Sequence, residues 1–285
     1  MGRALKAEVS SPKILMKKLS RYTILNLASR PERRLLAYCN AIRDGVPKKR
    51  IHFWTGLDFE TLDELGRHAV ENGFQRFKPL IGRSEPVRGT MAGQNYNLIR
   101  YLTDRVQRDT LELFVHDDVY FNPKIVYASG WKYIKQLCRY MQTFLPKANP
   151  ECPEFNILQL DPHNQWDLGK SHDLKPAYFK KGDTMILKGI WSICDFALVL
   201  SQKGAQMILD KLLAREDWTA MEALFIRKNH ENDWYWSPAG AYTTAFPIVK
   251  RFPIKVAGSD TEDGRIGLFE IEAKRTCPKR EIIFL

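Results

Sequence analysis

Two adjacent aspartates offer the clearest candidate chemistry in the sequence. The apolar run 111–115 ends in His116, Asp117 and Asp118. Two carboxylates side by side repel one another in a partly dry site, and a bound Mg²⁺ or Mn²⁺ removes that cost. The same cation can neutralise a diphosphate leaving group, because carboxylates and phosphates share its coordination sphere. The alternative is that the aspartates only cap a turn before Asn122-Pro123.

A second candidate site is rich in arginine. Arg30, Arg33 and Arg34 crowd the first turn of a helix that is expected from about residue 30 to residue 43, after a Ser29-x-x-Glu32 capping box. Cations at that end oppose the helix dipole, whereas a bound phosphate reverses the sign of the interaction. The segment therefore predicts a phosphate site, unless the arginines point sideways into solvent.

A third candidate is the pair Glu216 and Asp217, ahead of a helix that Thr219 can cap. A carboxylate there could take a proton from an acceptor hydroxyl as a general base. Asp217 could equally be the N-cap itself. Sugar or acceptor contacts are assigned to a polar, aromatic region at four positions: His163, Trp166, Trp191 and Asp195. Asp195 could instead be a buried, satisfied carboxylate, and His163 an ordinary histidine.

Alternating strand and helix patterns surround these candidates. We expect strands at 22–27, 51–55, 111–115 and 155–160, with another after 74–81. We expect helices at 13–19, 30–43, within 57–73, and at 91–106, 126–144, 201–213 and 219–229, and a long surface loop at 161–189. This order predicts an α/β fold with a mostly parallel sheet and helices on both faces, whose ligands bind at the carboxyl ends of the strands.

The chain of 285 residues is long enough for one large α/β domain, and its excess positive charge is concentrated near its start. Residues 1–50 hold 13 Lys and Arg against 3 Asp and Glu, a balance of +10, and the rest holds 31 against 30, a balance of +1. Such a region attracts polyanions, including nucleic acid and membrane headgroups, or is simply a solvated basic face. We expect a basic arm at 1–20 and one catalytic domain at 21–285, with donor binding at about 21–125 and the acceptor side at about 126–285.

The cysteines and the hydropathy pattern suggest the cell compartment. The five cysteines form no CxxC pair and are odd in number, which argues against a disulfide framework or a structural zinc site. No run approaches the roughly 18 apolar residues that a membrane span needs, and residues 1–19 lack the apolar stretch of a secretory signal. We expect a cytoplasmic protein without a transmembrane segment, possibly at a membrane surface.

Four motifs in this order resemble glycosyltransferase family 25, which contains lipooligosaccharide and collagen galactosyltransferases. The resemblance covers about residues 22–222 and consists of the Asn-Leu-x-x-Arg-x-x-Arg pattern at 26–33, Gly89 to Gly93, His116 to Asp118, and Gly189 followed by 196–205. The chain departs from the family at His116, which replaces the first acidic residue of the metal motif. A neutral imidazole can bind Mn²⁺ but brings no negative charge.

The resemblance implies a GT-A (Rossmann-like) fold, a nucleotide-sugar donor, commonly a UDP-sugar, and Mn²⁺ or Mg²⁺ at Asp118, with His116 beside it. It also implies an acidic residue near Asp217 or Glu216 close to the acceptor. We assign the donor contacts to Asn26, Arg30, Arg33, Asp58, Gly93, Asn97 and Asp117.

The acceptor stays open at this point. It could be a glycan, a lipid-linked sugar or a protein side chain, or it could be a hydroxymethylated base in DNA, which the enzyme would have to flip out of the duplex. A nucleotidyltransferase also uses paired aspartates and Mg²⁺, but releases pyrophosphate. A non-catalytic nucleotide-binding or nucleic-acid-binding α/β protein is the rival from another class, and His116 favours it.

Overall fold

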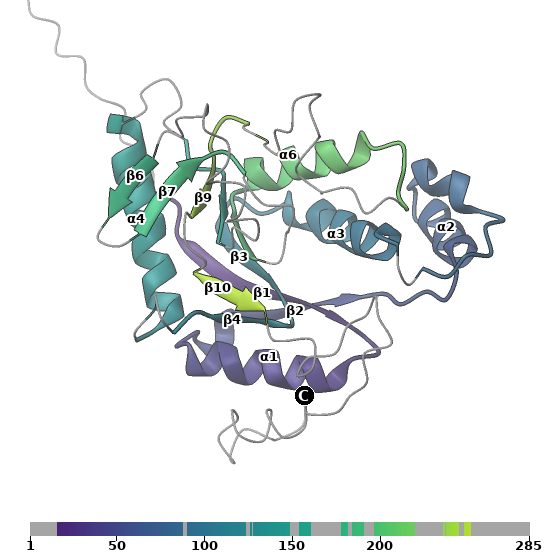
Figure 1. Cartoon of the computed structure of the whole chain (residues 1–285), viewed down its shortest axis with the longest axis horizontal. Coiled ribbons are helices and arrows are strands. Elements are labelled where there is room, and N and C mark those ends of the chain that lie inside the picture. Colours follow the sequence, from purple (N-terminus) through teal and green to yellow (C-terminus); the bar gives the residue numbers. More distant parts are fainter. Residues whose placement is uncertain are drawn as a thin grey trace, which may run out of the picture.

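Strands from both halves of the chain join in one central sheet (Figure 1). The computed structural model describes residues 16–87, 90–123, 126, 128–148, 154–160, 178–181, 184–190, 197–219, 236, 238–244 and 248–251. Within these residues, eight strands pair in the order β2-β1-β3-β8-β5-β9-β7-β6. Their bounds are β1 Leu19–Leu27, β2 Ile51–Gly56, β3 Leu111–His116, β5 Ile157–Gln159, β6 Tyr178–Lys181, β7 Thr184–Lys188, β8 Ala197–Leu200 and β9 Ala241–Thr244.

The sheet is mixed. Strands β2, β1 and β3 are parallel, and so are β5 and β9. Strand β8 runs antiparallel between β3 and β5, and β7 runs antiparallel between β9 and β6. The expected α/β class is confirmed, and a parallel direction dominates, since β7 and β8 run against the other strands of the sheet. A separate two-stranded sheet pairs β4 Val119–Phe121 with β10 Val249–Arg251.

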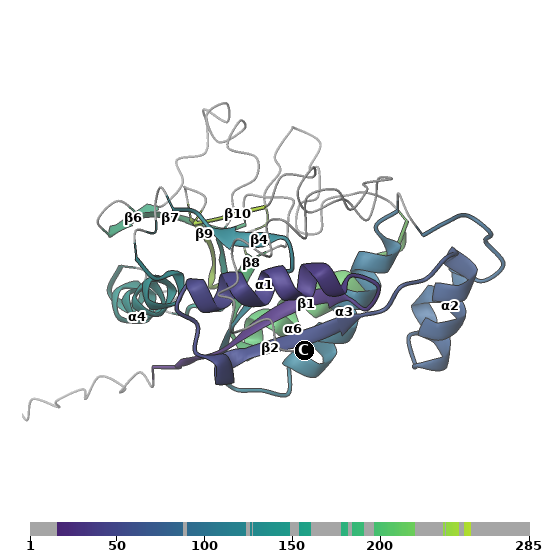
Figure 2. The same cartoon turned by 90° about the horizontal axis from the view of Figure 1, so that it is seen from below.

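Helices cover both faces of the sheet (Figures 1 and 2). One apolar cluster unites α1 and α4 with β1 and β3, and a second unites α2, α3 and α6 with the opposite face. Strand β3 serves both: Leu113 and Val115 face the first cluster, whereas Phe114 faces the second, as the two-residue period of a strand requires. The helices are α1 Pro31–Arg43, α2 Leu62–Glu71, α3 Ala92–Arg105, α4 Gly130–Ala148 and α6 Gln202–Leu213, and the 3₁₀ turns are η1 Lys48–Arg50 and η2 Gln75–Leu80.

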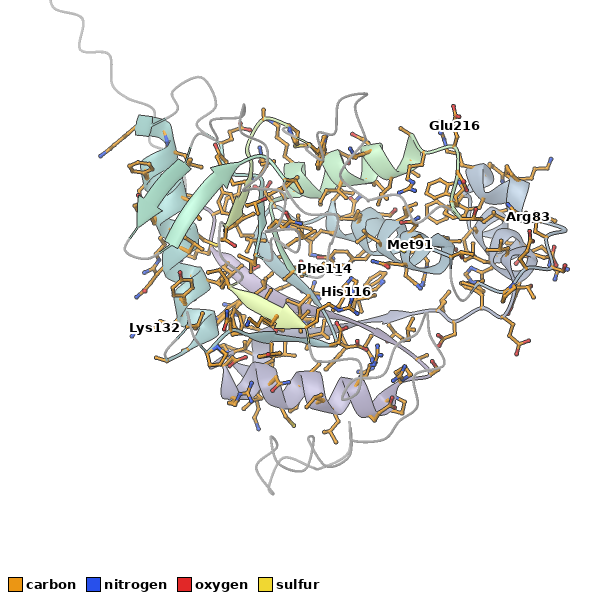
Figure 3. The ribbon with its side chains drawn as sticks, viewed as in Figure 1. Arg83, Met91, Phe114, His116, Lys132 and Glu216 are labelled. Atoms are coloured by element: carbon orange, nitrogen blue, oxygen red, sulfur yellow. The ribbon has the colours of Figure 1, made fainter. Side chains whose placement is uncertain are left out.

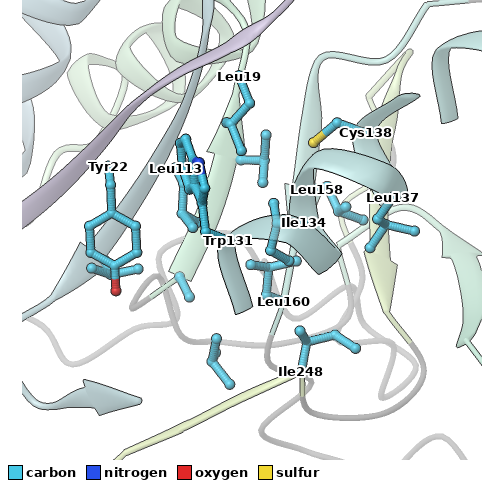
Figure 4. Packing of buried hydrophobic residues seen from close by; sticks show 14 of the residues in the cluster. Leu19, Tyr22, Leu113, Trp131, Ile134, Leu137, Cys138, Leu158, Leu160 and Ile248 are labelled. Carbon is cyan, nitrogen blue, oxygen red and sulfur yellow. The ribbon is translucent and has the colours of Figure 1, made fainter. Parts of the chain in front are cut away.

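Helix α4 shows why its sequence packs on the sheet. Ile134, Leu137, Cys138 and Met141 recur at helical spacing and are all buried in the first cluster (Figure 4). Trp131 meets Tyr22 of β1 edge to face, with ring centroids 6.4 Å apart. Burial of this kind contributes roughly 1.5–3 kcal/mol for each large apolar side chain.

Several expected elements are wrong in detail. The capping box fails, because the N-cap of α1 is Arg30 and makes no side-chain cap bond. The segment after residue 74 forms the 3₁₀ turn η2 rather than leading into a strand. Residues 178–188 contain the antiparallel strands β6 and β7 instead of loop. Residues 16–18 are not helical, and Leu19 starts β1; residues 1–15 and the helix expected at 219–229 lie outside the described residues, apart from Thr219.

The structure also bears on the predictions about the cysteines and about membrane-spanning helices. Cys39 of α1 is disulfide-bonded, which the odd number of cysteines did not indicate, whereas Cys138 is a free, buried thiol. None of the helices that the structure describes is both long enough and apolar enough to cross a bilayer.

The connections from β1 and from β2 lead to strands on opposite sides of β1. From β1 the chain passes through α1 to β2 on one side, and after α3 it returns to β3 on the other side of β1. Because the two connections leave in opposite directions, the ends of β1 and β3 form a switch point of the sheet. We call this corner, which holds Asn26, Asp117 and Asp118, the crevice. Open α/β sheets bind their ligands at such a switch point.

Candidate functional site

A hydrogen bond joins the two central strands at this crevice. Leu25 of β1 is in register with His116 of β3, which places Asn26 beside Asp117. The Asn26 side-chain amide donates to Asp117 Oδ2 at 2.7 Å and to the backbone carbonyl of Arg30 at 3.0 Å. Asn26 and Asp117 are 3% and 5% exposed, so this polar contact is buried.

The arginine-rich start of α1 closes the same corner. Arg33 Nη1 lies 3.5 Å from Asp117 Oδ1, and both side chains are buried. Arg30 donates to Glu32 at 2.6 Å, and the Arg34 guanidinium lies over the Phe53 ring, 4.3 Å from its centroid. Arg33 does not point sideways into solvent, and its contact with a phosphate stays a prediction. Its described partner is an aspartate of the chain, where we had expected a phosphate.

Asp118 has a different partner. Its Oδ2 accepts from Arg251 Nε at 2.7 Å and lies 2.5 Å from Arg251 Nη2. Pairing of β10 with β4 brings the two side chains together, since Arg251 is in register with Val119, the neighbour of Asp118. Asp118 is 3% exposed, and within the described part of the chain its Oδ1 is buried without a hydrogen-bond partner. Sequence reasoning missed Arg251, whose only signal was a basic pair, Lys250-Arg251, after an apolar run.

His116 points away from the two aspartate contacts. It is the last residue of β3, and its ring meets Phe114 edge-on with centroids 5.7 Å apart, on the face that α3 and α6 cover (Figure 3). Asp117 instead contacts Asn26 and Arg33 on the α1 side. Residues next to each other in the sequence therefore serve opposite sides of the sheet.

The described residues fit a divalent cation through one carboxylate. Asp118 Oδ1 is buried and uncompensated, while both oxygens of Asp117 already contact Asn26 and Arg33. No group of three His, Cys, Asp or Glu side chains gathers at a common point within the described ranges. Mg²⁺ sites at nucleotides commonly use one or two carboxylates and take their remaining ligands from phosphates and water, so this supply is sufficient when a diphosphate is bound.

Three expected donor contacts hold the loops of this edge in place. Asp58 accepts from the Ser29 backbone N–H at 3.1 Å, which ties the loop after β2 to the loop after β1. The Asn97 side-chain amide makes two hydrogen bonds with the Leu57 backbone: it accepts from the N–H at 2.8 Å and donates to the carbonyl at 2.9 Å. A Cβ at Gly93 would lie 2.9 Å from Val87. These contacts position the loops, and direct contact of these residues with a donor stays a prediction.

Glu216 and Asp217 are not brought to the aspartate pair. Both are exposed beyond the end of α6, and Figure 3 shows Glu216 well apart from His116 and toward Arg83. Asp217 Oδ1 accepts from the backbone N–H and the hydroxyl of Thr219, each at 2.8 Å, and the helix that Asp217 could cap lies outside the described residues. Its role as general base stays a prediction. The four expected sugar contacts all lie outside the described residues: His163, Trp166, Trp191 and Asp195.

The basic residues of the first fifty positions divide between two edges of the sheet. Three lie at the crevice, at the start of α1. The others that the structure describes sit where β1 and β2 begin or where α1 ends, which is the opposite edge: Lys17, Lys18, Arg21, Arg43, Lys48, Lys49 and Arg50.

Fold and site together define an α/β protein with a buried, charge-paired polar cluster at the switch point of its parallel strands. Comparison of the chain with protein-family models and with curated proteins yields no match.

Proposed function

We propose that this protein is a glycosyltransferase of the GT-A type, which moves a sugar from a nucleotide-sugar donor to a hydroxyl acceptor at the carboxyl ends of β1 and β3. The observation that carries the proposal is the buried Oδ1 of Asp118, which has no hydrogen-bond partner among the described residues, beside the Asn26–Asp117 contact. A buried carboxylate oxygen without a hydrogen bond is costly, and such exceptions concentrate where a ligand completes the site.

The side chains of the crevice take separate parts in this proposal. Asn26 and Arg33 fix Asp117, which keeps the end of β3 against the loop after β1. Asp118 Oδ1 is the protein ligand for Mn²⁺ or Mg²⁺, which would supply the charge that a leaving diphosphate needs. The donor's nucleotide would lie along the loop between β1 and α1, within reach of the α1 N-terminus, whose backbone N–H groups favour phosphate.

A hydroxyl on a glycan, lipid-linked sugar or protein fits the acceptor better than a base in DNA. Among the first fifty positions, the described basic residues outside the crevice lie at the amino edge of the sheet, opposite the aspartates. DNA bound there through counterion release would be held away from the donor. A DNA acceptor would therefore need contacts other than these.

Hydrolysis and transfer assays with UDP-, GDP- and dTDP-sugars in Mn²⁺ test the proposal. Asp118→Asn keeps the shape of the side chain and removes its charge, and we expect it to lower turnover at least about a hundredfold, the cost of removing one preorganised electrostatic contact. Asp109→Asn is the matched control, because Asp109 is an exposed aspartate paired only with Lys17 in the described contacts. Release of pyrophosphate would identify a nucleotidyltransferase instead, and full activity of the Asp118 variant would exclude the proposed site.

A further inference from the structure

The ion pair between Asp118 and Arg251 places a cation of the protein where the proposed function places a metal. The Asp118 side chain is 4% exposed, so its negative charge is out of water and needs a partner. Arg251 supplies one through two guanidinium nitrogens on a single oxygen, Oδ2. Its own side chain is 48% exposed, so the guanidinium spans from the buried carboxylate to solvent.

Among the described residues, the ion pairs of Asp117 and Asp118 balance one another in charge. Two buried carboxylates, Asp117 and Asp118, face two guanidiniums, those of Arg33 and Arg251. A dication added to this set would leave an excess of about two positive charges in a partly dry site, which is unfavourable. A nucleotide diphosphate would cancel that excess, so the cation and the diphosphate should enter together.

The two arginines differ in how easily they can move. Arg33 belongs to helix α1, and its side chain is only 4% exposed. The atoms packed around it therefore hold it in place. Arg251 lies at the end of the three-residue strand β10 and is half exposed. A planar guanidinium binds carboxylate and phosphate through the same pair of N–H donors, so Arg251 can exchange one anion for the other without losing its hydrogen bonds.

We infer that Arg251 is the resting counter-ion of Asp118: its guanidinium takes the place of a divalent cation in the free protein and passes to the diphosphate when a nucleotide binds. Arg251 then performs two functions. It keeps the free protein from taking up metal at Asp118, and it becomes a phosphate-binding residue once the donor is present. The second function rests on the proposed sugar transfer, whereas the first does not.

Mn²⁺ binding to the full chain, followed by the electron paramagnetic resonance signal of free Mn²⁺, tests the inference without any turnover. Without nucleotide, Arg251→Gln should bind Mn²⁺ at least about tenfold more tightly than the wild type, because Asp118 has lost its counter-ion. Lys250→Gln, a neutral substitution at the adjacent position of β10, should behave as the wild type does. With saturating UDP, wild-type Mn²⁺ affinity should rise about tenfold or more, and that of Arg251→Gln should rise less.

Two further variants connect the effect with the ion pair. Asp118→Asn combined with Arg251→Gln should lose the gained Mn²⁺ affinity, since the carboxylate is gone. Arg251→Lys keeps the charge without the planar fork and should lie between the wild type and Arg251→Gln; it also carries the comparison if Arg251→Gln does not fold. Equal Mn²⁺ affinity of the wild type and Arg251→Gln without nucleotide would overturn the inference. If Arg251→Gln binds Mn²⁺ more tightly than the wild type but nucleotides change the Mn²⁺ affinity of no variant, the counter-ion role of Arg251 holds and the proposed function is excluded.

Discussion

The buried contact between Asn26 and Asp117 should be the main energetic link between β1 and β3 at the site. Asn26→Ala removes an amide that donates at 2.7 Å to a charged oxygen and at 3.0 Å to a carbonyl. A hydrogen bond to a charged group is worth about 1.5–3 kcal/mol and one to a neutral group about 1 kcal/mol. We therefore expect the variant to lose ~2–4 kcal/mol of the free energy of unfolding.

A double-mutant cycle isolates the contact from the rest of this loss. Asp117→Ala breaks the contact from the other side and also leaves Arg33 buried without its carboxylate, so it should cost more than Asn26→Ala, about 3–5 kcal/mol. In the double variant the hydrogen bond is lost only once. The coupling free energy between the two sites should then be about 1.5–3 kcal/mol, measured from urea unfolding curves of the four proteins.

Additivity would refute this reasoning. If the two losses sum in the double variant to within about 0.5 kcal/mol, Asn26 and Asp117 do not interact energetically, and the crevice is not a connected polar site. Unequal urea slopes would signal a changed unfolded state, so the comparison requires similar slopes in all four proteins.

Two further predictions concern charges away from the crevice. Burial raises the pKa of Asp44 from 3.8 to about 6, although Arg43 opposes this. The folded protein thus holds this proton more tightly than the unfolded chain does, and its ionisation between pH 4 and 6 costs stability. As pH rises through that window, the free energy of unfolding of Asp44→Asn should increase relative to that of the wild type by up to ~3 kcal/mol, measured by urea unfolding. A difference between the two proteins that does not change with pH would contradict this prediction. Glu112 and Arg105 form an ion pair 3.3 Å apart with both side chains fully buried, so Glu112→Gln should lower the free energy of unfolding by about 3–5 kcal/mol. A loss below about 1 kcal/mol would show that this buried charge pair contributes little to stability.

Much of the fold could be predicted because buried strands and helices show a recognisable pattern of apolar residues in the sequence. Strand β3 lies between two apolar layers and is a continuous apolar run, apart from Glu112. Helix α6 begins at Ser201, whose hydroxyl accepts from the Gly204 backbone N–H as the cap pattern indicates. Strands β6 and β7 are harder to predict, because their short apolar stretches, Tyr178-Phe179 and Met185 to Leu187, stand between lysines and other polar residues.

The site could be predicted only where neighbouring strands bring it together. Asn26 and Asp117 end adjacent parallel strands, so strand order alone suggests that they meet. The Ser29 capping box failed because Arg30 occupies the cap position and Ser29 lies in the loop that Asp58 holds. Arg251 reaches Asp118 across 133 positions through the pairing of two three-residue strands, which no local pattern encodes.

The backbone explains why two adjacent aspartates are unequal. Asp117 and Asp118 occupy the turn between β3 and β4, and their side chains contact different parts of the chain. Asp117 faces α1, where Asn26 and Arg33 contact both of its oxygens. Asp118 faces β10, and one of its buried oxygens has no hydrogen bond within the described residues. The two carboxylates therefore have different roles: Asp117 joins β1 and β3, whereas Asp118 pairs with Arg251, at the position that we propose for a metal ion when a diphosphate is bound.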